Sequence, residues 1–446
     1  MIHRSVSEWA YLPIEPDGEG AFTRTHADRL IAVACATTLG GDDGAGVLTD
    51  HHRRLRAQQV VGVLAAPGCT LEILPKIEGL GDGDDEASRT RIRGRLVHML
   101  AVAHDLNLAV GDETALDTQR STLLEVLIGI FCRRLMDVLR HGMPRRYVER
   151  EGDLPALRGR LDVNRQFTVF AATPQRLACR FEAFSDDIAL NQVMKATVAR
   201  LSRLSQSPVN QRRLRELGHL YGDVSAVPVD ALRWERIVLD RTNHRWRGLR
   251  DLARLLLSGD YQTTSHGNAP GFSLLFAMND LFEAYVAKVL ARALQGSELH
   301  VVAQDRRLYC LRDSEGARRF QVRPDIVVCR GAEAVMVIDT KWKRIAPRID
   351  DLKQGVSQAD VYQMMAYGRL YECPRLMLIY PHHGKLAAAG RTGSYQVIGG
   401  GDGLVTATID LARPDTRTQI EELVRGTIAS VEVGTDAIVP AYVVNL

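Results

Sequence analysis

The stretch Arg323–Lys343 reads RPDIVVCRGAEAVMVIDTKWK and carries charged residues within two apolar runs. The runs IVVC and AVMVI have the β-branched, apolar content of paired strands, and the residues that join them predict a turn. Asp325 precedes the first run, whereas Asp339 and Lys341 follow the second. Because a buried charge is costly without a counter-ion, a metal or a catalytic role, these residues predict a functional site.

The alternation of side chains along a strand predicts the geometry of this site. Asp339 and Lys341 should point to one face while Thr340 turns away, and antiparallel pairing should bring Asp325 within reach. Two carboxylates and the Thr340 carbonyl are hard oxygen ligands that suit Mg²⁺, with water and a substrate phosphate completing an octahedron. Such a metal lowers the pKa of a bound water, and Lys341 can orient that water and offset negative charge. The alternative is a plain salt bridge at a strand end.

The segments around this stretch predict an α/β/α sandwich. Their order is helix, antiparallel meander, helix and strand, which suits a sheet covered on both faces. The expected helices span 273–294 and 357–371, and the expected strands span 299–304, 307–311, 319–329, 334–342 and 375–381.

The length of 446 residues predicts two or three domains. We expect a multidomain α+β and α/β protein, with a β-rich amino-terminal domain over 1–85, a mainly helical middle domain over 86–265 and the sandwich over 266–446. Gly-rich and polar segments at 79–86 and 261–271 set these boundaries.

Local patterns fill in the first two domains. Strand-like runs lie at 29–34, 60–68 and 69–77. In the middle domain, apolar residues recur at helical spacing over 121–142, with Ser121 as a candidate N-cap, and a strand pair is expected over 156–167 and 174–184.

Composition and charge limit the class of protein. A hydrophobic fraction of 46% with 25% charged residues is typical of a globular chain. Seven scattered cysteines without CxxC spacing favour a reducing cytoplasm, and neither a signal peptide nor a membrane span is expected. Two arginine-rich stretches, 89–95 and 233–254, suit phosphates, and the second also carries Trp234 and Trp246 for stacking bases; the alternative is a solvated helix face.

Pro324 and Asp325, followed by the D-x-K at 339–341, resemble the motif of the PD-(D/E)XK nuclease superfamily. The resemblance implies that 266–446 is a nuclease domain that cuts DNA with Mg²⁺. Gln363 and Tyr367 stand at i and i+4, on one face of the helix that follows. They resemble the Q-x-x-x-Y element of RecB-like nucleases, which supports the site and contacts DNA. The alternative is a core tyrosine and a surface glutamine.

Two further residues join the predicted site. Glu283 in NDLFEAYV could present a third catalytic carboxylate from the preceding helix, as in many of these nucleases; the alternative is an exposed helix charge. Lys343 follows Lys341 by two residues and is assigned a DNA-binding or supporting role with Gln363 and Tyr367.

Motifs along most of the chain resemble the McrC subunit of McrBC modified-cytosine restriction systems. They lie at 71–77, 157–167, 181–196, 279–286 and 323–343, and the similarity runs from about 50 to about 385. The resemblance implies a subunit that cuts double-stranded, typically methylated DNA while bound to a ring of McrB, an AAA+ GTPase. It also implies that the amino-terminal region, within 1–85, engages the ring and stimulates its hydrolysis. Asp325, Asp339 and Lys341 then form the catalytic triplet.

The sequence contains no G-x-x-x-x-G-K-[ST] motif, so nucleotide hydrolysis is expected from another polypeptide. Two alternatives remain: a stand-alone RecB-like repair nuclease, and a non-catalytic activator of an AAA+ ring. The target base, the partner's use of GTP or ATP, the cut position and the stoichiometry stay open. So do the roles of residues 1–50 and 390–446.

Overall fold

The computed structural model of the chain describes residues 1–16, 18–41, 43–77, 80, 85–106, 122–170, 173, 175–241, 243–258, 271–303, 308–346, 348–349, 355–398 and 401–432. Helices and strands form two compact units, one of Met1–Arg120 with Tyr261–Leu446 and one of Ser121–Asp260. The fold is thus a mixed, multi-sheet α/β fold, as expected. The predicted boundary segments 79–86 and 261–271 lie largely outside the described residues.

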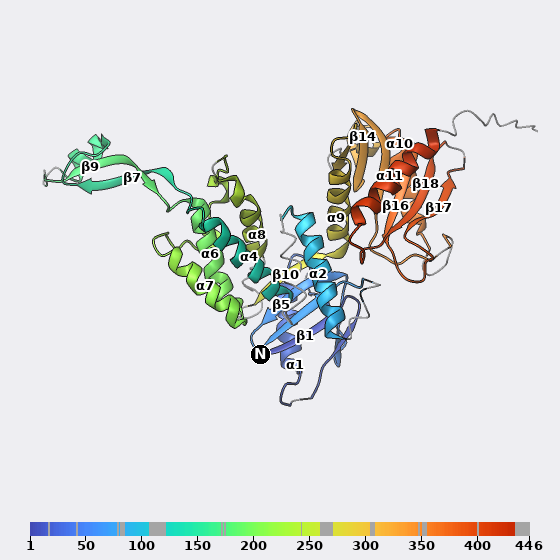
Figure 1. The fold of residues 1–446 in the computed structure, drawn as a ribbon, viewed down its shortest axis with the longest axis horizontal. Coiled ribbons are helices and arrows are strands. Elements are labelled where there is room, and N and C mark those ends of the chain that lie inside the picture. Colours follow the sequence, from blue (N-terminus) through green and yellow to red (C-terminus); the bar gives the residue numbers. More distant parts are fainter. Residues whose placement is uncertain are drawn as a thin grey trace, which may run out of the picture. The chain divides into compact units, whose positions relative to one another are not determined.

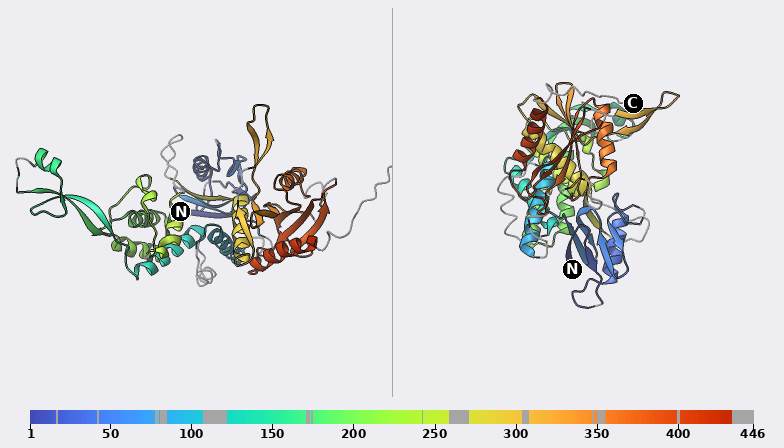
Figure 2. Two further views of the ribbon diagram at one scale, coloured as in Figure 1. Left: turned by 90° about the horizontal axis from the view of Figure 1, so that it is seen from above. Right: turned by 90° about the vertical axis from the view of Figure 1, so that its right-hand side faces the viewer.

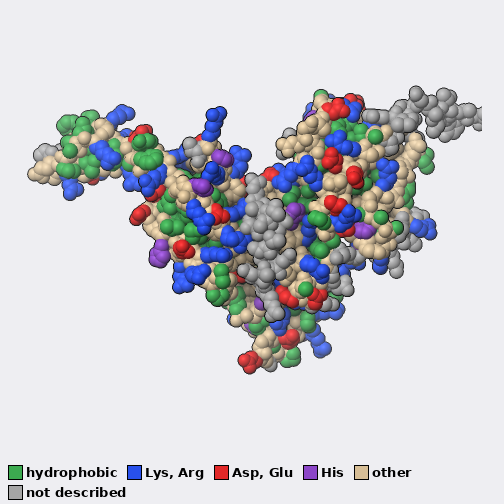
Figure 3. Space-filling model, viewed as in Figure 1, with side chains coloured by type: hydrophobic (Ala, Val, Ile, Leu, Met, Phe, Trp, Pro, Cys, Tyr) green, Lys and Arg blue, Asp and Glu red, His purple; other side chains and the backbone are tan. Residues whose placement is uncertain are grey.

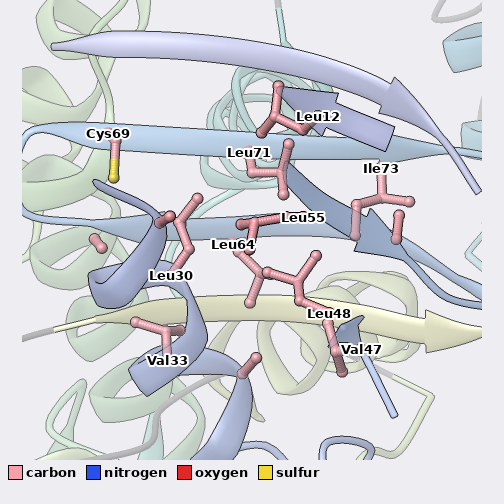
Figure 4. Close-up of a cluster of buried hydrophobic side chains, with 14 of the residues drawn as sticks. Leu12, Leu30, Val33, Val47, Leu48, Leu55, Leu64, Cys69, Leu71 and Ile73 are labelled. Atoms are coloured by element: carbon pink, nitrogen blue, oxygen red, sulfur yellow. The ribbon is translucent and has the colours of Figure 1, made fainter. Parts of the chain in front are cut away.

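The first unit begins with a four-stranded sheet in the order β1-β6-β5-β10. Its strands are β1 (Ile2–Ser7), β6 (Cys69–Leu74), β5 (Val60–Ala66) and β10 (Phe272–Ala277). The helix α1 (Arg24–Cys35) packs on this sheet, next to a small sheet of β2 (Tyr11–Pro13), β4 (Arg54–Ala57) and β3 (Leu48–Asp50). Figure 4 shows their shared core, where Leu30 and Val33 of α1 meet Leu64 and Leu71 of the sheet.

Two elements differ from the prediction. The run 29–34 was expected as a strand but lies in α1, because Ala27, Leu30 and Val33 recur at helical spacing and are buried together. A helix was expected over 273–294, but its first residues, up to Ala277, belong to the strand β10, which pairs antiparallel with β5. At this crossing a Cβ on Gly62 would lie 1.9 Å from the Leu274 carbonyl oxygen, so only glycine fits.

The domain boundaries shift accordingly. Because β10 belongs to the amino-terminal sheet, the domain expected from 266 starts instead with α9 (Met278–Ala293). The helix α2 (Glu86–Ala103), which was expected in the middle domain, packs against α9 and β6 of the first unit. The amino-terminal and carboxy-terminal parts of the chain are therefore one compact unit rather than two separate domains.

The carboxy-terminal sheet has the order β11-β14-β15-β16-β18-β17. Its strands are β11 (Leu299–Ala303), β14 (Ile326–Arg330), β15 (Glu333–Thr340), β16 (Arg375–Pro381), β18 (Gly403–Ile409) and β17 (Gly390–Gln396). The helices α9 and α11 (Thr416–Glu432) cover one face, and α10 (Gln358–Leu370) covers the other, as Figure 2 shows. This layering confirms the predicted sandwich. Residues after 390, which were not interpreted, add β17, β18 and α11.

A separate hairpin interrupts the meander. Within the part of the chain that the structure describes, its strands β12 (Leu308–Arg312) and β13 (Arg318–Val322) pair only with each other. The meander that builds the main sheet is therefore β11, β14 and β15, which pair antiparallel in that order, and β16 joins β15 in parallel.

The second unit combines helices with a three-stranded ribbon. Its helices are α4 (Leu123–Leu139), α5 (Val163–Thr168), α6 (Ala189–Leu204), α7 (Pro208–Leu220) and α8 (Arg247–Ser258), with short turns η1 (Val229–Ala231), η2 (Trp234–Arg236) and η3 (His244–Trp246). The cap of α4 is Thr122; the predicted cap Ser121 lies outside the described residues.

The ribbon has the order β7-β9-β8, with β7 (Arg146–Leu154), β9 (Leu177–Ser185) and β8 (Arg160–Leu161). It extends from the helices of its own unit in Figure 1, and apolar and basic side chains share its surface in Figure 3. The predicted pairing of 156–167 with 174–184 is confirmed only for β8 and β9, because 163–168 is helical and the long partner of β9 is β7.

The arginine-rich stretches are less available to DNA than expected. Arg93 of α2 is 5% exposed and donates to both carboxylate oxygens of Glu72, at 2.8 and 2.9 Å. It also donates to Glu86 at 2.9 Å. Trp246 is 4% exposed, so it cannot stack on a base. At these two positions the prediction of DNA contact was wrong, because burial in the fold takes up the side chains.

We predict that Arg93→Met lowers the free energy of unfolding by about 3–5 kcal/mol, because Glu72 is left charged and buried without its main partner. The double variant Glu72→Leu/Arg93→Met should recover much of this loss, since packed apolar groups replace the pair. Urea unfolding followed by circular dichroism measures both. A double variant no more stable than the single one would contradict this account.

Candidate active site

The two predicted acids lie side by side at one edge of the carboxy-terminal sheet. Asp325 directly precedes β14, and the pairing of Ile326 with Ile338 continues to place it opposite Asp339 on β15. Asp339 is 1% exposed. The Thr340 amide and hydroxyl both donate to Asp325 Oδ2, at 2.7 and 2.8 Å. The strand pattern therefore predicted correctly that the two acids converge. Thr340 was expected to turn away, but its hydroxyl contacts Asp325.

Lys341 completes this group. Its Nζ lies 2.7 Å from Asp339 Oδ2 and 4.0 Å from Asp360 Oδ1, and its side chain is 26% exposed. Asp339 and Lys341 thus project to the same side of the strand, as the i, i+2 spacing predicts. The lysine offers a positive charge at a rim that solvent can reach.

Burial and repulsion set the protonation of the acids. Burial, together with the nearby charge of Glu283, raises the pKa of Asp325 to about 6, although the Thr340 bonds oppose the shift. Burial and the Asp325 charge raise the pKa of Asp339 to about 6, against the pull of Lys341. For Lys341, burial lowers the pKa, but its bond to Asp339 outweighs this and keeps the lysine charged. The carboxylates are held together at a cost in free energy.

The oxygen atoms at this edge fit a divalent cation. Asp339 Oδ1 is buried and has no hydrogen-bond partner among the described residues. Within the same residues, no three Asp, Glu, His or Cys side chains form a closed metal-binding group. The site therefore fits an open arrangement of two carboxylates and a backbone carbonyl, in which Mg²⁺ keeps several waters. An unpartnered carboxylate oxygen beside a second acid is what such an ion would neutralise.

Glu283 lies on α9, close enough for its charge to raise the pKa of Asp325. Its side chain is half-buried. The alternative, in which Glu283 is an exposed charge on the helix surface, therefore does not apply. The structure therefore brings a third acid toward the pair, while the catalytic role of Glu283 stays a prediction.

Gln363 and Tyr367 of α10 support the segment that carries Asp325. Gln363 Nε2 donates to Tyr367 Oη at 2.5 Å, and Tyr367 Oη donates to the Arg323 carbonyl at 3.1 Å. Tyr367 is 2% exposed and belongs to the core that covers this face of the sheet. Burial raises its pKa, so the hydroxyl remains a donor at neutral pH. The tyrosine is therefore both a core residue and a support for the backbone beside Asp325.

Sequence reasoning missed Asp360. It is 9% exposed, lies in the first turn of α10 and accepts from Lys343 Nζ at 2.6 Å. Burial raises its pKa, but the bonds from Lys343 and Ser357 outweigh this and lower it below the ordinary value. The spacing Ser357-x-x-Asp360 at a helix start could have indicated it. Lys343, predicted to contact or support DNA binding, is thus held against α10 by an acid.

Trp342 was also missed, and it connects the two sheets of this unit. Its Nε1 donates to Glu8 Oε1 at 2.7 Å, and its carbonyl accepts from Gln59 Nε2 at 2.8 Å. Its amide donates to Asn279 Oδ1 at 3.2 Å, and Phe282 packs edge-on to its ring at 5.3 Å. Because Trp342 stands between Lys341 and Lys343, these contacts fix the backbone of both lysines. No local sequence signal could indicate a partner 334 residues away.

Comparison with known families gives this site a context. A family model described as "McrBC 5-methylcytosine restriction system component" matches residues 55–381. The chain belongs to this McrBC family. The match covers Glu283, Asp325, Asp339, Lys341 and the Gln363–Tyr367 pair, and it agrees with the predicted extent of about 50 to 385.

Solved structures agree with the McrBC family assignment. A chain of a Thermococcus gammatolerans half-complex, described as McrB AAA+ hexamers with bound McrC, is similar with a TM-score of 0.70 and 19% identity, over 95% of this chain and 99% of that one. A chain of the Thermococcus gammatolerans McrBC complex is similar with a TM-score of 0.51 and 22% identity, over 66% and 88%. These likenesses concern the fold. No curated protein matches the chain.

We predict that Asp339→Asn unfolds at a higher temperature than the wild type near pH 7.5 in the absence of divalent cations. The folded pKa of about 6 exceeds the ordinary 3.8, so the native state binds the proton more tightly. The contribution of Asp339 to the stability of the wild type therefore falls as the pH rises from about 4 to about 6 and stays lower above it. The asparagine carries no such charge, so the gain should be roughly 1–3 kcal/mol at neutral pH and shrink near pH 5.

Thermal unfolding with and without Mg²⁺ checks this account. Added Mg²⁺ should raise the midpoint of the wild type and leave that of Asp339→Asn unchanged, because the variant lacks a charged ligand. A matched control is Asp415→Asn, which removes an exposed acid whose pKa is lowered by Gln419 and Arg413. The quantity to compare is the stability of Asp339→Asn minus that of the wild type. A smaller difference at neutral pH than at pH 5 would contradict the prediction.

Proposed function

We propose that this chain is the nuclease subunit of a McrBC-like restriction system, an endodeoxyribonuclease of the PD-(D/E)XK type. It hydrolyses phosphodiester bonds of double-stranded, typically methylated DNA with Mg²⁺. The observation that supports the proposal best is the meeting of Asp325, Asp339 and Lys341 at one sheet edge in a chain of this family.

Each residue has a distinct part in the proposed reaction. Asp325 and Asp339 hold the cation, with the Thr340 carbonyl as a further oxygen ligand. When bound, Mg²⁺ supplies charge neutralisation at the scissile phosphate and makes water more acidic. Lys341 orients the attacking water and offsets negative charge that develops on the phosphate. Glu283 contributes a third carboxylate.

The remaining site residues position these groups. Tyr367 holds the Arg323 carbonyl and so fixes the approach to Asp325, with Gln363 oriented behind it. Asp360 keeps Lys343 and, more weakly, Lys341 at the rim. A contact of Gln363 and Lys343 with the DNA backbone belongs to the same proposal.

A non-catalytic scaffold fits the observations less well. Asp339 is buried and Asp325 is half-buried, and acids whose pKa values rise to about 6 destabilise the fold at neutral pH. Residues that cost stability persist where function requires them, and a mere activator of a ring needs no such pair. A stand-alone RecB-like nuclease would use the same chemistry, and the family assignment favours the restriction subunit.

The proposed partner is a McrB-like AAA+ GTPase ring. The solved relatives are described as McrB AAA+ hexamers with bound McrC, and this sequence has no P-loop motif of its own. We assign ring contact to the amino-terminal region within 1–85. There Trp9 and Tyr11 are 44% and 42% exposed. Arg56 lies 5.3 Å from the centre of the Trp9 ring, and Arg54 lies 3.8 Å from the centre of the Tyr11 ring. Exposed aromatic and arginine side chains are typical of protein interfaces.

We predict that Asp339→Ala abolishes cleavage of methylated DNA in the presence of Mg²⁺, the ring partner and GTP, because the cation loses a ligand. Lys341→Ala should reduce the cleavage rate by roughly 10²–10³-fold while Mg²⁺ still raises the unfolding temperature. A gel assay of a circular plasmid measures cleavage. Asp415→Ala removes an exposed acid as a control and should cut normally. Normal cleavage by Asp339→Ala would overturn the assignment.

We predict separately that the partner ring, and not this chain, hydrolyses the nucleotide. The purified chain alone should release no phosphate from GTP or ATP, and adding it to the ring should increase the ring's hydrolysis rate. Asp339→Ala should stimulate the ring as the wild type does, because the acid lies in the nuclease site. Turnover of nucleotide by the chain alone would contradict this arrangement. Within the described residues no helix is long and apolar enough to span a membrane.

A further inference from the structure

The hairpin of β12 and β13 starts at the edge of the sheet that carries the acids. β11 ends beside Ile326, and β13 ends at Val322, three residues before Asp325. At its base, Leu308 and Val322 pack against the core cluster that contains Tyr367. In both views of Figure 2 this hairpin, coloured between gold and orange, stands clear of the sheet. Its base is thus anchored at the candidate active site while its tip reaches outward.

The outer part of the hairpin does not contribute to the core. Every residue from 310 to 321 is exposed except Asp313, which is half-buried. Leu311 is 57% exposed and Phe320 is 74% exposed. The backbone of Phe320 has φ of +54°, a conformation that bulky residues rarely adopt. The chain therefore holds an aromatic ring in a costly conformation and gains no burial from it, which indicates an intermolecular role.

The charges of the hairpin indicate the nature of its ligand. Arg312 and Arg318 stand directly opposite each other in the pairing register, where like charges repel. Neither forms an ion pair with a described residue; Arg318 lies 5.9 Å from the centre of the Tyr309 ring. Arg319 is partly neutralised by Asp313 at 3.0 Å. A polyanion laid across the hairpin would relieve this repulsion.

We propose that the β12–β13 hairpin is a DNA-binding element that holds the duplex beside the scissile phosphate. Arg312 and Arg318 contact backbone phosphates, and Phe320 packs against bases or sugars in a groove. Aromatic and apolar wedges flanked by arginines suit such contacts. The proposal rests on the proposed nuclease function, because that function places the substrate at this edge.

The length of the hairpin sets where the contact falls. Five residues at about 3.3 Å per residue extend roughly 17 Å from the rim. This distance corresponds to about five base pairs at about 3.4 Å each. The phosphates that contact the arginines therefore lie within about half a helical turn of the cut. An acidic protein surface is a weaker candidate, because the hairpin shares its edge with the residues proposed to cut DNA.

Binding of a short labelled duplex to the full chain tests the inference. Ca²⁺ replaces Mg²⁺ to prevent cutting, and fluorescence anisotropy is recorded over a series of salt concentrations. Arg312→Ala/Arg318→Ala should weaken binding roughly tenfold and reduce the slope of log K against log salt by about 1.8, as for two lost phosphate contacts. The control Arg413→Ala/Arg417→Ala removes two exposed arginines elsewhere in this unit and should change the slope much less.

Phe320→Asn gives an independent test. Asparagine tolerates a positive φ, so the variant should unfold at the same temperature as the wild type or higher. Loss of the ring should nevertheless weaken DNA binding roughly tenfold. Unchanged DNA binding in this variant would show that the ring has no part in the interface.

The outcomes separate this inference from the nuclease assignment. Hairpin variants should keep the stabilisation by Mg²⁺, because the acids are untouched. Unchanged affinity and salt slope in the double arginine variant would overturn the inference even if the wild type cuts DNA. If the hairpin variants bind DNA normally but no longer associate with the AAA+ partner, the inference is also overturned, in favour of a protein contact. If the wild type fails to cut but the hairpin variants lose DNA affinity, the nuclease assignment fails, and with it the placement beside a scissile phosphate, while the contact of the hairpin with DNA stands.

Discussion

The structure depends on one costly constraint, the close approach of half-buried Asp325 and fully buried Asp339 at the edge of the carboxy-terminal sheet. Burial raises the pKa of both acids to about 6; the charge of Glu283 adds to the shift of Asp325, and the charge of Asp325 adds to that of Asp339. The surrounding residues make the arrangement tolerable. Thr340 donates two hydrogen bonds to one acid, and Lys341 forms an ion pair with the other. One oxygen of Asp339 is still left without a hydrogen-bond partner among the described residues, beside the place of the proposed Mg²⁺.

This constraint explains why the site is held from several directions. Tyr367 secures the backbone before Asp325, and Asp360 secures the lysine beyond β15. Trp342 bonds to Glu8 and Gln59, so the amino-terminal sheet also fixes the backbone beside Lys341. The carboxy-terminal sheet is consequently supported in part by residues from the amino-terminal part of the chain. Its geometry is supported by residues that a division of the chain into successive domains would place elsewhere, and β10 and α2 show the same interdependence.

Much of the fold could be predicted because its signals are local. Alternating and apolar runs indicated β14, β15 and β16, and helical spacing indicated α10, so Asp325, Asp339 and Lys341 could be placed together. Short apolar runs were less informative. The run in α1 reads equally as strand or helix, and β10 resembles the start of the helix that follows it. In each case the tertiary partner decided the outcome, since burial against a neighbouring sheet outweighs weak local preference.

The sequence by itself determined the order of the elements around the site and the positions of the two acids and the lysine on them. It could do so because strand and helix periodicities act over a few residues. Only the tertiary structure decided which charges are buried and what they contact. The sequence indicated Arg93 as a phosphate ligand, whereas in the fold it is bound to Glu72. In the sequence Asp360 resembles any acid in the first turn of a helix, whereas in the fold it accepts a hydrogen bond from Lys343. Pairings across many residues leave no periodic signal, and burial rather than residue type decides the free energy and the pKa of a charged group.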